Sequence, residues 1–253
     1  MKKHVMGSLL LSCGLMLGCT SSRTVSVLGI TGGRYELTAA YDSLPDTGAE
    51  AIVRSYKASI DSVMGMVVGH AAEPLTVSRP ESPLSNLVAD VLRLSAVRCA
   101  GEKADLGMVN IGAVRSDLPA GPVTLCDIYK VLPFDNRVCL LKLTGAQLRR
   151  VCEQILLEGS VAVSGGCIVG DGEHRLLSVI VGGEPVVDER TYSVATIDYL
   201  AEGNSGLTEL KSVADKTFPE GVYLRPLFVE FMRLLESEGN ALSVASGKRI
   251  LIN

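Results

Sequence analysis

Val109-Asn110-Ile111-Gly112-Ala113-Val114-Arg115 is the stretch around which the rest of this sequence is organised. The apolar run Leu106 to Val109 leads into it and, bounded by turn residues, predicts a buried strand. At the end of that strand, Asn110 can donate and accept hydrogen bonds, and Gly112 allows the backbone to approach a ligand closely. Arg115 presents a planar fork that suits phosphate or carboxylate. The stretch therefore predicts a ligand site at the end of a buried strand.

A second stretch, Val131-Leu132-Pro133-Phe134-Asp135-Asn136, places an aromatic ring between a proline turn and a polar pair. This is not an obvious core position for a phenyl ring. An aromatic face beside hydrogen-bonding groups suits a flat heterocycle. Structural roles are the alternative for both stretches, with Arg115 in an ion pair and Phe134 in ordinary packing.

The composition indicates a globular protein with an aliphatic core. The chain has 253 residues, of which 47% are hydrophobic and 21% charged, enough for one large or two small domains. The formal net charge is -4, and no basic run is present that would neutralise the phosphates of a nucleic acid. We therefore expect no nucleic-acid partner.

The N-terminus has the parts of a bacterial export signal. A Lys-Lys-His cluster at residues 2–4 precedes the apolar segment Val5 to Leu17, which is too short to span a bilayer as a helix. Leu15-Met16-Leu17-Gly18-Cys19 resembles a lipobox, although a leucine stands where a small residue is usual. We expect residues 1–18 to be a lipoprotein signal peptide and Cys19 to carry lipid, which would anchor the protein to a membrane of the bacterial cell envelope, facing the periplasm. Ordinary signal cleavage is the alternative.

Capping residues and apolar periodicity predict the helices. Thr47-Gly48-Ala49-Glu50 has the spacing of a capping box, and apolar residues follow it at helical spacing. Residues 19–69 are therefore expected to form a tether and a linker helix, with a short strand at 34–38. Ser82 and Thr144 are expected to cap two later helices, and the glycines after each to end them. These helices and the last one are expected over Pro83 to Gly101, Thr144 to Gly159 and Pro226 to Glu238.

The second half of the chain is rich in strand patterns. Gly182-Gly183 predicts a hairpin turn. Because helices and strands mix without strict alternation, we expect an α+β domain with a mixed sheet over residues 70–253. The expected strands are Val161 to Val163, Ile168-Val169, Leu176 to Val181, Tyr192 to Thr196 and Arg249 to Ile252.

Histidine and cysteine patterns indicate no catalytic or metal site. The chain has three histidines, of which His4 belongs to the signal, and neither His70 nor His174 stands in a metal-ligand motif. There is no P-loop, G-x-S-x-G or S-x-x-K motif. No C-x-x-C pair is present, so we expect unpaired thiols, although an exported protein permits disulfides. The cysteines concerned are Cys99, Cys126, Cys139, Cys152 and Cys167.

Several motifs follow one another in a characteristic order. Asn110 to Arg115 is similar to N-x-G-G-I-R, Leu132 to Asn136 to L-P-F-G-N, and Tyr192 to Gly206 to Y-x-V-A-T-x-[DN]-[FY]-L-A-x-G-G-D-G. Together with Tyr56 to Met64, Glu81 to Leu87 and Lys142 to Gly145, they resemble the C-terminal, substrate-recognition domain of the 5'-nucleotidase family. This family includes UDP-sugar hydrolases and 2',3'-cyclic phosphodiesterases. The resemblance implies the layered α/β/β/α-type fold of that domain.

The resemblance also implies a role for each matching residue. Phe134 and Tyr199 would sandwich a nucleobase, the two asparagines would hydrogen-bond the nucleoside, and Arg115 would reach the phosphate. No catalytic residue is expected in this chain. The expected substrate-binding residues are Asn110, Gly112, Arg115, Phe134, Asn136 and Tyr199.

Three positions depart from the family pattern. Ala113 stands where the family prefers glycine, and Ser205 stands where it has an aspartate that holds ribose hydroxyls. The arginine expected just before Glu81 is matched only by Arg79, which is out of register beside Pro80. Arg79 and Ser205 are therefore included as further substrate-binding candidates, and the identity of the substrate is left open.

The metallophosphatase domain of the family, with its D-x-H and G-N-H-E motifs, has no counterpart in this sequence. The leading hypothesis is a lipoprotein that supplies the nucleotide-recognition half of a 5'-nucleotidase-type hydrolase. A separate chain would then carry the catalytic domain and its two divalent metal ions. The alternatives are a non-catalytic nucleoside- or nucleotide-binding lipoprotein and a scaffold that has lost binding.

Overall fold

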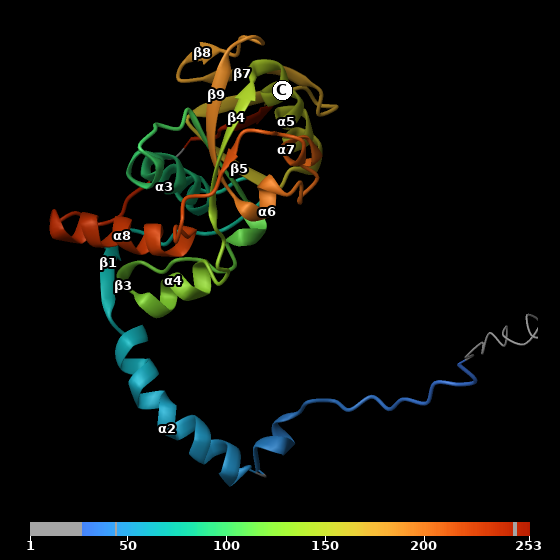
Figure 1. Cartoon of the computed structure of the whole chain (residues 1–253). Helices are drawn as coiled ribbons and strands as arrows, with labels where there is room; N and C mark the ends of the chain where they lie inside the picture. The colour runs from blue at the N-terminus through green and yellow to red at the C-terminus, as the bar shows by residue number, and fades with distance from the viewer. Residues whose placement is uncertain (1–26, 44, 245–246) are drawn as a thin grey trace, which may run out of the picture. The chain divides into compact units, whose positions relative to one another are not determined.

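The computed structural model describes residues 27–43, 45–244 and 247–253 (Figure 1). The chain divides into two compact units, Met1–Ile52 and Val53–Asn253. The expected signal peptide and Cys19 lie outside the described residues. No helix within the described ranges is long and apolar enough to cross a membrane.

The described part of the first unit contains little regular structure. The 3-10 helix η1 (Ala39–Ser43) is a short turn with no buried residue. Residues 34–38 form no strand, so the prediction of a strand there was wrong. Their alternating pattern is not sufficient, because a strand requires a partner and these residues are all exposed and pair with none in the described chain.

The predicted linker helix is present as α2 (Thr47–Met64). Its cap is Asp46 rather than Thr47. One Asp46 carboxylate oxygen accepts hydrogen bonds from the backbone N–H groups of Gly48 and Ala49, each at 3.0 Å. This carboxylate satisfies two of the backbone donors that a helix start leaves unpaired. No residue of α2 is buried.

The predicted strand at Leu106 is β2 (Leu106–Asn110), and all of its residues are buried. It pairs in parallel with β9 (Thr191–Ile197) and antiparallel with β5 (Val161–Ser164). On its other side, β9 pairs antiparallel with β4 (Val138–Thr144). The five-stranded sheet has the order β10 (Lys216–Thr217), β4, β9, β2 and β5.

Two helices lie on the two sides of this sheet (Figure 1). They are α3 (Pro83–Ala100) and α5 (Gly145–Glu158). As predicted, Ser82 and Thr144 cap them, and each ends at a glycine with positive φ. Because helices cover the sheet from both sides, β2 is buried along its whole length and its side chains do not alternate between apolar and polar.

A second sheet contains the predicted C-terminal strand, which lies at its edge. The turn Gly182-Gly183 has φ values of 60° and 91° and joins β7 to β8. The order is β11 (Ile250–Ile252), β6 (Gly166–Gly170), β7 (Leu176–Val181) and β8 (Glu184–Pro185), with β11 parallel to β6. These mixed sheets confirm the predicted α+β class.

The remaining elements complete the second unit. β1 (Val67–Ala71) and β3 (Gly121–Thr124) form an antiparallel pair. α8 (Leu224–Ser237) packs against β1, α3 and α4 (Leu125–Val131). The helices not yet given are η2 (Ile111–Ala113), α6 (Asp198–Ala201) and α7 (Thr208–Lys211).

The five cysteines that the structure describes are free thiols. Cys139 and Cys152 lie in the core, and burial raises the pKa of each thiol to about 12. They therefore stay protonated at neutral pH and behave as small apolar side chains.

Candidate functional site

Strand pairing brings four loops to one edge of the five-stranded sheet. β2 and β9 are parallel, so the carboxyl end of β2 at Asn110 and that of β9 at Ile197 lie at the same edge. β4 and β5 are antiparallel to these strands. Their amino ends therefore lie at this edge, where Val138 pairs with Ile197 and Val161 pairs with Asn110. Segments far apart in the sequence meet here for this reason.

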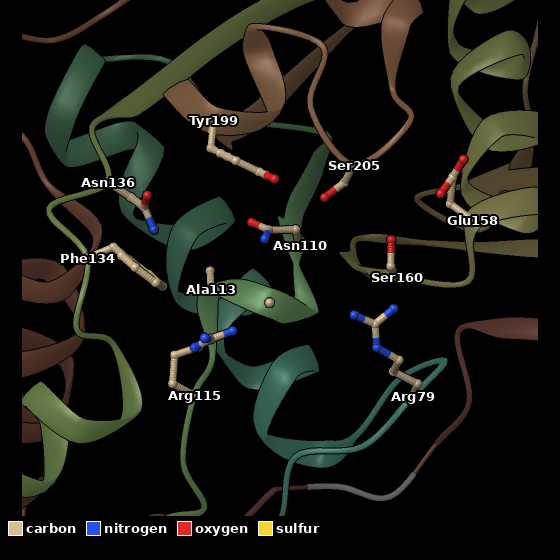
Figure 2. A pocket seen from close by; sticks show the side chains of 11 residues that line it. Arg79, Asn110, Ala113, Arg115, Phe134, Asn136, Glu158, Ser160, Tyr199 and Ser205 are labelled. Atoms are coloured by element: carbon tan, nitrogen blue, oxygen red, sulfur yellow. The ribbon is translucent and has the colours of Figure 1, made fainter. Parts of the chain in front are cut away.

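These segments line a pocket of about 470 Å³ (Figure 2). This volume lies in the range of small-molecule sites. All of the predicted substrate-binding residues, including Arg79 and Ser205, contribute to the lining. Their placement is thus established, and their binding roles stay predictions. The lining residues are Arg79, Asn110, Gly112, Ala113, Arg115, Phe134, Asn136, Glu158, Ser160, Tyr199 and Ser205.

Asn110 is a buried amide with an unsatisfied acceptor. The residue is 8% exposed, and its Oδ1 atom has no hydrogen-bond partner in the described part of the chain. Leaving such an acceptor unpaired costs about 1–3 kcal/mol. Gly112 makes room for this amide, since a Cβ on Gly112 would lie 3.2 Å from Asn110 Nδ2. The pocket therefore contains an oriented amide that is free to receive a donor from a ligand.

Phe134 stands in a loop that α8 holds in place. Arg225 of α8 donates to the backbone carbonyl of Leu132 at 3.0 Å and forms an ion pair with Asp135. The Arg225 guanidinium also lies over the ring of Tyr129, 4.0 Å from its centroid. Phe134 is 46% exposed, so it does not belong to the buried core.

Tyr199 supplies the second ring. It lies on α6, directly after β9, and is 44% exposed. Figure 2 shows both rings projecting into the pocket, with the Asn136 amide alongside them. Two exposed rings at a pocket wall beside an amide can receive a planar heterocycle.

The loop after α6 has an unusual backbone. Ser205 has a φ of 53°, in the left-handed region that residues other than glycine rarely adopt. Asn204 closes the loop by donating from Nδ2 to the Tyr199 carbonyl at 2.9 Å. This loop places the Ser205 hydroxyl at the pocket wall (Figure 2).

The charged groups of the pocket form no ion pair within the described part of the chain. The guanidinium groups of Arg79 and Arg115 form no hydrogen bond or ion pair with any described residue, so the ion-pair alternative for Arg115 has no support. Arg115 instead lies over the Phe134 ring, 5.7 Å from its centroid. Two arginines against the single carboxylate of Glu158 make this pocket suited to an anionic ligand.

Two residues of the pocket lining belong to no sequence motif. Glu158 and Ser160 flank Gly159, the C-cap of α5, where polar residues are typical of any solvated helix end. They enter the pocket because β5 pairs with β2. No local pattern predicts this pairing, so only the strand order could have identified them.

The described residues include no group of three or more His, Cys, Asp or Glu side chains that could hold a metal ion. His70 forms a pair with one carboxylate: its Nδ1 lies 2.8 Å from Glu236 Oε2, which connects β1 to α8. The pocket groups can bind, orient and neutralise an anionic ligand. Among the described residues, no hydrogen bond joins the Ser160 or Ser205 hydroxyl of the pocket to a carboxylate.

Residues 67–212 match the family described as "5'-nucleotidase, C-terminal domain". The chain belongs to this family. All of the residues that line the pocket fall within 67–212, so the whole pocket lies in the matched region.

Curated relatives are longer than this chain. It is 28% identical over 219 residues to the NAD 5'-nucleotidase of Haemophilus influenzae, an alignment that covers 74% of this chain and 36% of that protein. It is 30% identical over 176 residues to the probable 5'-nucleotidase of Treponema pallidum, which covers 60% and 29% respectively. The chain therefore spans about a third of the length of these 5'-nucleotidases.

Solved structures show the same fold. The 5'-nucleotidase precursor of Thermus thermophilus matches with a TM-score of 0.69 and 25% identity, over 82% of this chain and 43% of that one. The NAD nucleotidase of H. influenzae matches with a TM-score of 0.65 and 20% identity, over 82% and 41%. The α+β domain with mixed sheets is thus that of 5'-nucleotidase C-terminal domains.

Proposed function

We propose that this chain is the nucleotide-recognition half of a 5'-nucleotidase-type hydrolase. The observation that carries the proposal is the pocket. Two exposed rings converge there with a buried amide whose Oδ1 has no partner and with two arginines that form no ion pair among the described residues. A nucleotide has a group for each of these, namely a flat base, polar base or sugar atoms, and an anionic phosphate.

Each pocket residue then has a role. Phe134 and Tyr199 stack on the two faces of the base, and Asn110 and Asn136 hydrogen-bond the nucleoside. The guanidinium groups bind the phosphate, where the permanent charge of arginine favours the dianion. Gly112 has no side chain and so leaves room for the Asn110 amide beside it.

The chemical step belongs to a metallophosphatase domain on a separate chain. That domain would carry the two divalent metal ions, and this chain would supply binding and orientation. Two facts support this division: the family match is to a C-terminal domain, and the chain matches only 29% and 36% of the length of relatives that are 5'-nucleotidases. α2 offers a surface for the partner, because Tyr56, Ile60 and Val63 are 65%, 54% and 48% exposed.

Titration calorimetry of the full chain in detergent with AMP, adenosine and UDP-glucose tests the proposal. We expect saturable binding of AMP, tighter than that of adenosine, because the arginines gain a counter-ion. Added salt should reduce the advantage of AMP. We also expect metal-dependent hydrolysis of AMP only after a metallophosphatase chain, such as one encoded by an adjacent gene, is added. Binding without hydrolysis in that mixture would favour the ligand-capturing alternative.

We further propose that the protein is a lipoprotein anchored through Cys19 and facing the periplasm. The lipobox-like sequence before Cys19 supports this. Cells that express the wild-type chain with labelled palmitate should show label in the protein and place it in the membrane fraction. The C19S variant should lose both. Label that persists in that variant would contradict the anchor.

A further inference from the structure

Glu158 contributes a carboxylate to the pocket, and no stabilising bond to the described part of the fold accounts for its presence there. It is the last residue of α5, and its side chain is exposed and forms no hydrogen bond or ion pair with a described residue. Gln154, one turn earlier, uses its own amide to donate to Thr208. An anionic side chain in the last turn of a helix is unfavourable, because the C-terminal end of the helix dipole is already negative. Functional and strained sites are the places where such local rules are expected to be broken.

Packing places this carboxylate beside the loop that contains Ser205. A Cβ on Gly206 would lie 2.4 Å from both Cδ and Oε1 of Glu158, so the carboxylate sits directly over the Gly206 Cα. Gly206 also has a φ of 74°. Position 206 therefore requires glycine, both because a side chain would collide with Glu158 and because of the positive φ. The Glu158 carboxylate and the Ser205 hydroxyl thus lie in the same part of the pocket.

We propose that Glu158, together with Ser205, accepts hydrogen bonds from the vicinal hydroxyl groups of the sugar ring of the ligand. This rests on the proposed function. An ionised carboxylate only accepts hydrogen bonds, so the ligand group that faces it must be a donor. A phosphate is excluded from this position by repulsion, and the guanidinium groups of Arg79 and Arg115 are available for it.

The arrangement in Figure 2 agrees with this assignment. The Phe134 ring lies on one side of the pocket, and Glu158 lies on the other side with Ser205 and Ser160. A base stacked on Phe134 extends its sugar toward the opposite wall. Glu158 thereby makes the site specific for a ribose over a deoxyribose.

The test compares the dissociation constants of adenosine, 2'-deoxyadenosine and 3'-deoxyadenosine for the full chain in detergent. Hydrogen bonds to charged groups are stronger than those between neutral groups. The wild-type chain should therefore bind adenosine at least roughly tenfold more tightly than it binds either deoxynucleoside. The E158Q variant should lose most of this preference while it still binds 2'-deoxyadenosine. E153Q, on the same helix but outside the pocket, removes the same charge and should keep the wild-type preference.

The outcomes separate this inference from the proposed function. If the wild-type chain binds adenosine in a Phe134-dependent manner and E158Q keeps the full ribose preference, the role of Glu158 is overturned and the proposed function stands. If the wild-type chain binds no nucleoside or nucleotide, the proposed function fails and this inference fails with it. Retained binding of 2'-deoxyadenosine by E158Q shows that the variant is folded.

Discussion

Replacing Phe134 with alanine is expected to weaken the binding of adenosine and AMP by about 1–3 kcal/mol, roughly 5- to 150-fold in the dissociation constant. The ring is 46% exposed at the pocket wall, so its truncation removes a stacking surface and leaves no cavity in the core. Stability should therefore change little. Titration calorimetry measures the affinity, and urea denaturation measures the free energy of unfolding.

Two variants serve as controls for this result. F134Y keeps an aromatic face and should bind within a few-fold of the wild-type chain. Y35A removes an aromatic ring that is 85% exposed and lies outside the pocket, and it should bind as the wild type does. An unchanged affinity of F134A for both ligands would contradict base stacking on Phe134.

Replacing Arg225 with methionine is expected to lower the free energy of unfolding by about 2–3 kcal/mol and to weaken nucleoside binding as well. The Arg225 side chain is 11% exposed and donates to the Leu132 carbonyl at 3.0 Å. Its loss leaves that carbonyl and the Asp135 carboxylate without their donor. The loop that presents Phe134 should then become less ordered. Urea denaturation and titration calorimetry report the two effects.

A control and a double variant distinguish positioning from general destabilisation. R233M, also on α8, changes an exposed arginine for which the structure shows no bond to another described residue, and it should leave both quantities near the wild-type values. If Arg225 acts on binding through Phe134, the binding losses of R225M and F134A will not add in the double variant. Fully additive losses would show that Arg225 influences binding by another route.

The sequence alone determined the local elements of this fold. Ser82 and Thr144 begin helices because their hydroxyls accept from the backbone N–H three residues later, an interaction within one turn. Gly182-Gly183 forms a tight turn because both residues adopt positive φ. The family motifs also identified residues that line the pocket, including Arg79 despite its register. In each case the signal lies within a short segment of chain.

Only the tertiary structure decided how these elements combine. Residues 34–38 have a strand pattern without a partner, and so they form no strand. Glu158 and Ser160 enter the pocket because Asn110 pairs with Val161, and Arg225 controls the Phe134 loop from α8, 91 residues away along the chain. Strand pairing and packing of this kind join residues that no local pattern connects. Local signals therefore determined where helices and turns form, and the order of strands in the sheet decided which side chains share the pocket.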